Sequence, residues 1–159
     1  MKFNKKKSSI KNVKLGKNVT IIEPVNLYGC EIKDNCFIGP FVEIQNNVII
    51  GKNTRIQSHS FICSNVSIGE NCFIGHGVCF INDKFKNNKI EKNKKKFLKT
   101  KIGSHVLVGS NSTILPIKIE SHTTIGAGSV VTKNCLKKKI YAGNPAKEIK
   151  KLNDCYNRL

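Results

Sequence analysis

The hydrophobic positions of this chain recur every six residues, a period that belongs neither to a helix nor to a long strand. Each hexad has one large apolar residue, and a second, mostly small residue stands two positions before it. The large positions are Leu15, Ile21, Leu27, Ile32, Ile38, Ile44, Ile50, Ile56, Ile62, Ile68, Ile74, Phe80, Ile102, Val108, Ile114, Ile119, Ile125 and Val131. An α-helix needs a period of about 3.6 and a long strand one of about two, so short strands joined by two-residue corners explain the pattern better.

Three such strands make one triangular coil, so the eighteen hexads of residues 13–131 predict about six coils. The small positions include Cys30, Cys36 and Cys72, which we interpret as core residues. One corner position is repeatedly asparagine, which tolerates left-handed backbone: Asn35, Asn47, Asn53, Asn65 and Asn71. The pattern predicts an all-β fold, a parallel β-helix whose hexapeptide repeats resemble those of the left-handed kind.

The irregularities of the period all fall between the third strand of one coil and the first strand of the next. They are the five-residue steps Leu27 to Ile32 and Ile114 to Ile119, and the long interruption between Phe80 and Ile102. One edge of the prism therefore absorbs every insertion. The polar, lysine-rich residues 82–100 are expected to project there as an extended loop, either simply solvated or acting as an anion-gripping flap over a site.

The two ends of the chain fall outside the repeat. Residues 1–12 form a basic arm that lacks the apolar stretch of a secretory signal. Residues 132–159 predict an irregular strand, a turn at 143–145 and a short amphipathic helix with Ile149, Leu152 and Tyr156 on one face. We expect this segment to cap the open end of the prism, as solenoids require.

Composition sets the broad class. The chain has 159 residues, which suits one domain, and no apolar run near the ~18 residues of a membrane span. Its seven cysteines are odd in number and contain no CxxC pair, which favours reduced thiols. We therefore expect a cytoplasmic protein without membrane insertion.

The formal net charge of +18 suits a polyanionic partner such as nucleic acid, an anionic membrane or a phosphate-rich small molecule. No zinc-finger spacing, basic zipper or aromatic RNA-binding signature accompanies the charge. We expect no nucleic-acid partner, and a non-catalytic nucleic-acid-binding protein is the alternative from another functional class.

Two histidines, His59 and His76, fall at the corner after the second strand, one coil apart. In later coils the same corner holds small residues: Ser110, Asn111, Ala127 and Gly128. This column is expected to accept a slender ligand running parallel to the prism axis, with backbone amides available as donors.

The other two histidines, His105 and His122, stack at a different corner, where we interpret them as surface residues. A zinc site in a β-helix would need a close histidine pair and a third histidine from another coil. The histidines here are separated by 17, 29 and 17 residues, so we expect no metal.

Four stretches carry a family resemblance: "IGHGVCFIND", "IGSHVLVGSNSTILP", "IGAGSVVTKN" and "AGNPAK". With the hexad ladder, they resemble the hexapeptide-repeat acyltransferases over roughly residues 13–150. More narrowly, they resemble nucleotide-sugar 3-N-acetyltransferases that act on 3-amino-3,6-dideoxyhexoses or 3-aminouronates in surface-glycan biosynthesis.

The resemblance implies a homotrimer with active sites between neighbouring prisms and acetyl-CoA as co-substrate. Ser110, Ala127 and Gly128 would line the pantetheine, and Pro145 and Lys147 would approach the adenosine phosphates. The thiol end of the coenzyme would reach the level of His76.

On the substrate side, Asn82 matches the family asparagine placed near the sugar amine, and Asp83 accompanies it. We also assign His59 and Phe80 to this side, although the hexad places Phe80 in the core. The chain departs from its relatives in the loop, where they often have Pro-Arg and this chain has Lys86-Asn87.

The chemistry is acyl transfer from a thioester to an amine, which must be neutral and held close. His76 could take the amine proton, or the proton could pass to the departing sulfur, with Asn82 supplying the positioning. The favoured acceptor is a dTDP-3-amino-3,6-dideoxyhexose. The alternatives are a UDP-linked 3-aminouronate and, with His76 as base on a hydroxyl, O-acetylation.

Overall fold

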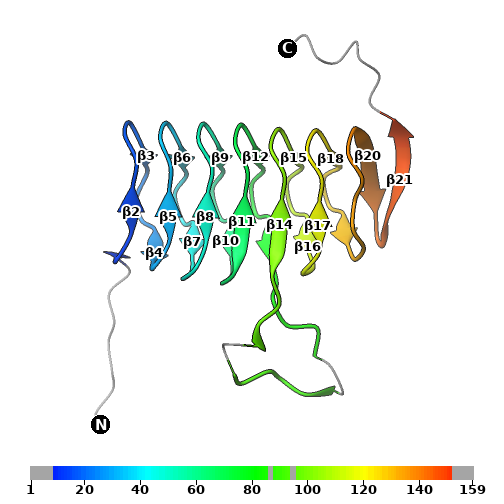
Figure 1. The fold of residues 1–159 in the computed structure, drawn as a ribbon, viewed down its shortest axis with the longest axis horizontal. Coiled ribbons are helices and arrows are strands. Elements are labelled where there is room, and N and C mark those ends of the chain that lie inside the picture. The colour runs from blue at the N-terminus through cyan, green and yellow to red at the C-terminus, as the bar shows by residue number, and fades with distance from the viewer. Residues whose placement is uncertain (1–8, 86–87, 94–95, 152–159) are drawn as a thin grey trace.

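The computed structural model describes residues 9–85, 88–93 and 96–151, which form a row of stacked three-sided coils (Figure 1). Each short strand pairs in parallel with the strand one coil away, as in the neighbouring strands β2, β5 and β8. The fold is the predicted left-handed parallel β-helix. Strands β2 to β19 make six complete coils, and β1 and β20 extend the stack at its two ends.

Three parallel sheets form the sides of the prism, named here in the order in which each coil crosses them. The first sheet contains β2 (Lys14–Leu15), β5 (Glu31–Ile32), β8 (Ile49–Ile50), β11 (Val66–Ile68), β14 (Thr100–Ile102) and β17 (Lys118–Ile119). The second contains β3 (Thr20–Ile21), β6 (Phe37–Ile38), β9 (Arg55–Ile56), β12 (Phe73–Ile74), β15 (Leu107–Val108), β18 (Thr124–Ile125), β20 (Lys139–Gly143) and β21 (Ala146–Lys151). The third contains β1 (Ile10–Lys11), β4 (Asn26–Tyr28), β7 (Glu43–Ile44), β10 (Phe61–Ile62), β13 (Cys79–Phe80), β16 (Thr113–Ile114) and β19 (Val130–Val131).

The large residue of each hexad points into the prism and pairs with its equivalent in the next coil, as Ile32 does with Ile50. From Leu27 onward all these residues are at most 2% exposed, so they form one continuous apolar column. Before Leu27, Leu15 is 49% exposed and Ile21 is half-buried, because β2 and β3 are the outermost strands of their sheets. Burial of this column fixes the register, since a one-residue slip would turn every inward side chain outward.

The small inward position also ties neighbouring coils together. Thr54 donates its hydroxyl to the Gly69 carbonyl at 2.9 Å, and Ser60 donates to the Gly75 carbonyl at 2.8 Å. A buried hydroxyl is tolerated because it finds such an acceptor. The predicted core cysteines Cys30, Cys36 and Cys72 are indeed buried.

Two cysteines outside the repeat register, Cys63 and Cys135, are buried as well. Burial raises the pKa of the Cys63 thiol to about 12 and that of Cys135 to about 11, so both are protonated thiols near neutral pH. Cys155 lies outside the described residues.

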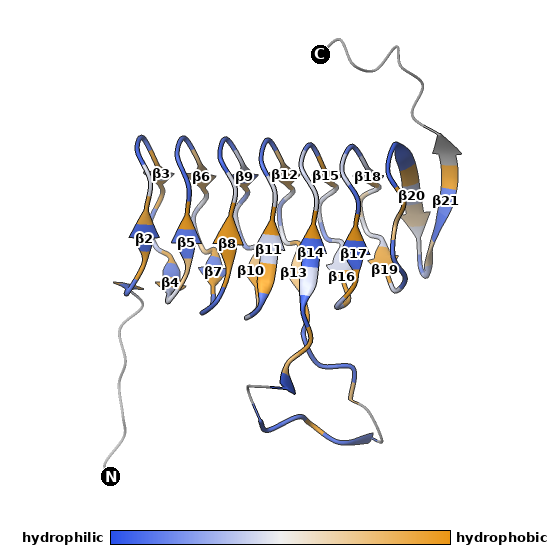
Figure 2. Ribbon diagram, in the orientation of Figure 1, coloured by the Kyte–Doolittle hydropathy of each residue, from blue (hydrophilic) through white to orange (hydrophobic). Residues whose placement is uncertain are grey.

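The corners define three edges: the first edge joins the first and second sheets, the second edge joins the second and third, and the third edge joins the third to the next first. The asparagines expected to adopt left-handed backbone do so, for example Asn35 (φ 58°), Asn53 (φ 57°) and Asn65 (φ 68°). The third edge releases the long loop between β13 and β14, which projects from the prism as predicted (Figure 1). Hydrophilic residues occupy most of the corners and of this loop (Figure 2).

The C-terminal segment differs from the prediction. Strand β20 extends the second sheet, and β21 folds back antiparallel on it, so residues 146–151 form a strand where we expected the helix to begin. Backbone pairing with β20 and the ion pair between Lys139 and Glu148 (2.6 Å) outweigh the weak helical pattern. Leu152 and Tyr156, the other two residues of the expected apolar face, lie outside the described residues. Within the described ranges there is no helix long and apolar enough to cross a membrane.

Candidate active site at the second edge

The second edge stacks five two-residue corners along the prism. They are Pro40-Phe41, Ser58-His59, His76-Gly77, Ser110-Asn111 and Ala127-Gly128. The second residue of each corner is left-handed, with φ between 59° and 66°. The structure therefore brings His59 and His76 onto one edge with three of the predicted coenzyme-binding residues, Ser110, Ala127 and Gly128.

Amides of this edge hold the coils together. The amide of Gly77 donates to the Ser58 carbonyl (3.0 Å), that of Asn111 to the His76 carbonyl (2.8 Å), and that of Gly128 to the Ser110 carbonyl (2.8 Å). Our expectation that the column offers its backbone amides to a ligand is therefore wrong for these three. The amides of Ser110 and Ala127, the first residues of their corners, are not among these bonded donors, so a ligand on this edge can use them together with side chains and van der Waals contact.

His76 is exposed, and its neighbours in both adjacent coils hold it. Its Nδ1 lies 2.8 Å from the Ser58 Oγ, and its amide donates to the Ser110 Oγ at 3.2 Å. If Nδ1 carries the proton and donates it to Ser58, Nε2 keeps its lone pair as an acceptor. Sequence reasoning did not single out Ser58, although it precedes His76 by 18 residues and so occupies the same corner position one coil earlier.

His59 has a different neighbour. Its ring stacks on Phe41 of the preceding coil, with centroids 4.8 Å apart and planes inclined by 27°. The two histidines of this edge are thus engaged separately, His59 by an aromatic ring and His76 by a hydroxyl. The contacts of His76 leave it the better placed for proton transfer.

Toward the C-terminal end of the prism the second edge becomes less covered by side chains. A Cβ at Gly77 would lie 2.4 Å from the Asn111 Oδ1, so the Asn111 side chain covers that corner. A Cβ at Gly128 would meet nothing within 4 Å, and Ala127 and Gly128 are both exposed. The last corner of the column therefore has free space beside it.

The hairpin of β20 and β21 borders this open end. The Gly143 amide donates to the Ser129 Oγ (3.2 Å), and Ala142 packs over Gly126 while pairing with Lys147 across the hairpin. Both Pro145 and Lys147 are exposed. The predicted coenzyme-binding residues on the edge and on the hairpin therefore belong to one region.

Two of the predicted substrate-side residues, Asn82 and Asp83, lie elsewhere, at the third edge. The Asn82 side-chain amide donates to the Ser64 carbonyl at 3.4 Å, and the Asn82 backbone carbonyl accepts the Leu98 amide at 3.0 Å. The Asp83 carboxylate accepts the amides of Phe85 and Glu91, each at 2.8 Å. Both residues organise the base of the loop, and β13 separates them from His76 in the same chain.

Phe80 was expected to contact substrate, but its side chain is 0% exposed. It belongs to the apolar column and supports the loop from beneath. No group of three or more His, Cys, Asp or Glu side chains suited to a metal ion occurs among the described residues.

The repeats match two known families. Residues 29–64 match "Bacterial transferase hexapeptide (six repeats)", and residues 65–81 and 99–133 match "Hexapeptide repeat of succinyl-transferase". Together the matches cover more than half of the chain. The chain belongs to the hexapeptide-repeat transferases. No curated protein sequence matches it.

Solved structures share the fold of this hexapeptide-repeat transferase. A variant of AntD, an N-acyltransferase from Bacillus cereus in complex with dTDP and coenzyme A, is 23% identical over 91% of this chain and 86% of that one, with a TM-score of 0.81. A galactoside acetyltransferase in complex with coenzyme A is 26% identical over 80% and 68% of the two chains (TM-score 0.69). The polySia-specific acetyltransferase NeuO is 26% identical over 90% and 81% (TM-score 0.59). These relatives agree with the predicted class, an acyltransferase.

Proposed function

We propose that this transferase moves the acetyl group of acetyl-CoA to the amino group of a nucleotide-linked amino sugar in the cytoplasm, with a dTDP-3-amino-3,6-dideoxyhexose as the favoured acceptor. The observation that carries the proposal is the second edge, where an exposed histidine stands below an open column of small residues. The resemblance to an N-acyltransferase crystallised with dTDP and coenzyme A supports the choice of acceptor.

In this proposal the coenzyme runs along Ser110, Ala127 and Gly128. Its phosphates lie toward the hairpin, where the Lys147 ammonium supplies positive charge. The absence of side-chain atoms near the Gly128 corner leaves room for the pantetheine chain. The thioester then lies near His76, one coil below Ser110.

The reaction forms one bond and breaks one. The amine nitrogen attacks the thioester carbonyl, the carbon–sulfur bond breaks, and the amine proton leaves by way of His76 Nε2 or directly to the departing sulfur. The Ser58 hydroxyl would orient the imidazole through Nδ1. Asn82 would hold the amine with its side-chain carbonyl oxygen, since an amide has no basic nitrogen.

Because His76 and Asn82 lie at different edges of one prism, a complete site requires a second chain. We propose a homotrimer in which the third edge of one chain faces the second edge of its neighbour. Co-expression of His76→Ala chains with Asn82→Ala chains tests this arrangement. Random assembly of the two inactive variants should restore about one site in four, because such a site takes its intact His76 and Asn82 from different chains. No recovered activity in mixed trimers would contradict a shared site.

Hydroxyl acceptors are the second candidate, favoured by the hydroxyl-supported imidazole of His76. A neutral alcohol needs a base more than a free amine does, so O-acetylation would depend almost wholly on His76.

Thiol release from acetyl-CoA, measured with a panel of acceptors, tests the proposal. The panel contains dTDP-3-amino-3,6-dideoxyhexoses, a UDP-linked 3-aminouronate and the matching sugars with a hydroxyl in place of the amine. Turnover with an amino sugar alone supports N-acetylation, and turnover with the hydroxyl sugars alone replaces it with O-acetylation. No turnover with any acceptor would overturn both.

A further inference from the structure

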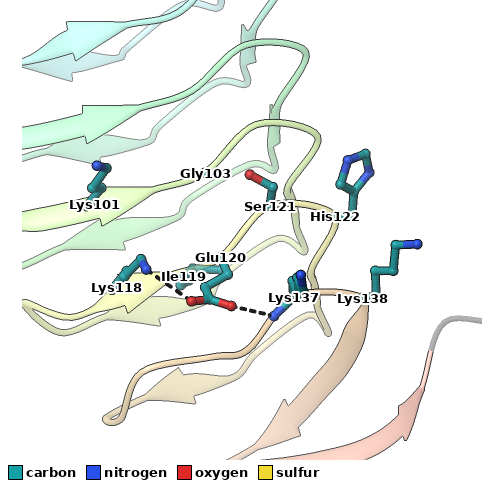
Figure 3. A pocket seen from close by; sticks show the side chains of 9 residues that line it. All are labelled: Lys101, Gly103, Lys118, Ile119, Glu120, Ser121, His122, Lys137 and Lys138. Carbon is teal, nitrogen blue, oxygen red and sulfur yellow. Dashed lines mark hydrogen bonds and ion pairs between the residues drawn. The ribbon is translucent and has the colours of Figure 1, made fainter.

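A polar groove of about 400 Å³ lies on the outer face of the first sheet near the C-terminal end of the prism (Figure 3). One wall consists of β14 and β17. The other is the segment after β19, where Cys135 bridges to Ile119 and so continues the first sheet. The charged residues that line it are Lys101, Lys118, Glu120, Lys137 and Lys138. None of the residues assigned to acetyl transfer lines this groove.

The strand register brings two lysines of the groove close together. Lys101 and Lys118 are register partners on adjacent parallel strands, so both side chains leave the same face of the sheet. Like charges directly opposite each other in a ladder are unfavourable unless an anion lies between them. Figure 3 shows Lys137 and Lys138 on the segment across from this pair.

One carboxylate stands among the four lysines. Glu120 binds the Lys118 Nζ at 3.0 Å and accepts the Lys137 amide at 3.1 Å. The hydrogen bond from Lys118, followed by that from the Lys137 amide, lowers the pKa of the Glu120 carboxyl, so it is ionised at neutral pH. Its single negative charge joins the two walls but leaves the groove strongly positive.

Lysines occupy adjacent outward positions of the first sheet only in its last two coils. Following the ladder from the N-terminal end, the outward positions of the first sheet are Lys14, Glu31, Ile49, Ser67, Lys101 and Lys118. Serine, isoleucine and glutamate therefore interrupt any basic track along this face. A nucleic acid or an anionic bilayer would need a longer positive surface, whereas a compact anion needs only this groove.

We propose that the groove binds the diphosphate group of a small molecule, such as a nucleoside diphosphate, with Lys101 and Lys118 on one side of the anion and Lys137 and Lys138 on the other. This site lies at the first sheet and the adjoining first-edge corner of Ser121 and His122, whereas the proposed coenzyme column lies at the second edge. The inference does not depend on acetyl transfer, because it rests on the charge and geometry of the groove alone.

Calorimetric titration of the full chain with inorganic pyrophosphate tests the site, in the presence of saturating coenzyme A. The double variant K101Q/K118Q should weaken binding about tenfold, since it removes two ammonium contacts. The matched control K14Q/K17Q removes the same charge at the other end of the prism and should bind within about twofold of the unchanged chain.

Equal affinity in both double variants would overturn the proposal, because the binding would then reflect net charge alone. Loss of pyrophosphate binding in saturating coenzyme A would also overturn it, since the groove would then belong to the coenzyme site. A parallel titration with a single-stranded oligonucleotide distinguishes binding of a small diphosphate from binding of nucleic acid. Oligonucleotide binding that K101Q/K118Q abolishes, without pyrophosphate binding, would assign the groove to nucleic acid instead.

Discussion

The first and second edges of the prism share one backbone and differ in the side chains that occupy it. On the first edge the left-handed residues contact one another in two runs. Side-chain hydrogen bonds join Asn18 to Asn35 at 3.2 Å, Asn35 to Asn53 at 3.2 Å and Asn53 to Asn71 at 3.1 Å, and further along the edge the His105 and His122 rings stack 4.7 Å apart. On the second edge the equivalent residues are Phe41, His59, Gly77, Asn111 and Gly128.

The difference shows that a ladder of side chains satisfies its own hydrogen bonds and fills the space along an edge. Where each side chain is satisfied by its neighbours in adjacent coils, as with Asn53, the edge needs no other partner. Where glycine replaces the ladder residue, as at Gly128, the same backbone leaves space beside it. The second edge also carries an exposed histidine whose Nε2 is turned away from its supporting hydroxyl. We therefore place coenzyme binding at the second edge, and we assign a structural role to the side-chain ladder of the first.

The largest expected effect comes from removing His76 at the second edge, with His105 at the first edge as the matched control. His76→Ala should lower acetyl transfer by about 10²- to 10⁴-fold if the imidazole is the base, with a smaller loss at high pH, where more of the acceptor is free amine. His105→Ala removes the same side chain from the first edge and should leave turnover unchanged. Steady-state kinetics at several pH values measures both. A mild, pH-independent loss in His76→Ala would make this histidine structural and leave the proton to the sulfur.

The next largest effect is expected from a substitution that fills the open corner at Gly128. Gly128→Asn places in the column a side chain that tolerates left-handed backbone, as Asn111 does one coil away (φ 59°). Because the added atoms would occupy the coenzyme path, coenzyme A should bind roughly tenfold or more weakly. Calorimetry measures the affinity, and thermal unfolding checks that the variant is folded. Unchanged affinity in a folded variant would remove this column from the proposed coenzyme site.

A smaller effect is expected at Ser58, which we interpret as a positioning residue. Ser58→Ala removes the oxygen 2.8 Å from His76 Nδ1, so the imidazole should lose orientation and kcat should fall by about tenfold while the KM for acetyl-CoA stays the same. Ser58→Thr keeps the hydroxyl and should restore most of the rate. If alanine and threonine give equal kcat, the hydroxyl has no part in orienting the histidine.

The smallest effect on activity is expected in the asparagine ladder. Asn53→Ala removes two side-chain hydrogen bonds and leaves a left-handed alanine (φ 57° at this position), which should lower the free energy of unfolding by roughly 1–2 kcal/mol. Asn53→Gly loses the same hydrogen bonds but accepts the backbone conformation, so its loss should be smaller. Denaturant unfolding distinguishes the two variants. Reduced acetyl transfer in folded Asn53→Gly would contradict a purely structural role for the asparagine ladder.

The fold could be predicted because one period determines both the strands and the side chains that they bury. Placing Ile38 inward also places Ile56 inward 18 residues later, and the third-edge position of the loop follows from the same count. The C-terminal strand could not be predicted in this way. Beyond Val131 the repeat stops, and the position of Ile149 suits a helical face as well as a strand.

The part of the candidate site that lies on one edge could be predicted, because counting the hexads assigns each residue to a coil and a corner. His76, Ser110 and Gly128 meet at one edge because they occupy the same corner in successive coils. Asn82 could not be placed in a complete site in this way: the count puts it at the third edge, and in the proposed homotrimer the side chains that face it belong to a neighbouring chain. The contact between Ser58 and His76 follows from the count but requires comparison of corners one coil apart.

The most direct test of the account is a crystal structure of the protein with coenzyme A bound. The account predicts that the pantetheine lies along Ser110, Ala127 and Gly128, that the thiol points toward His76, and that the phosphates lie near Lys147. Coenzyme A bound along the ladder of the first edge, with the second edge empty, would contradict the claim that the missing ladder residues create the binding site.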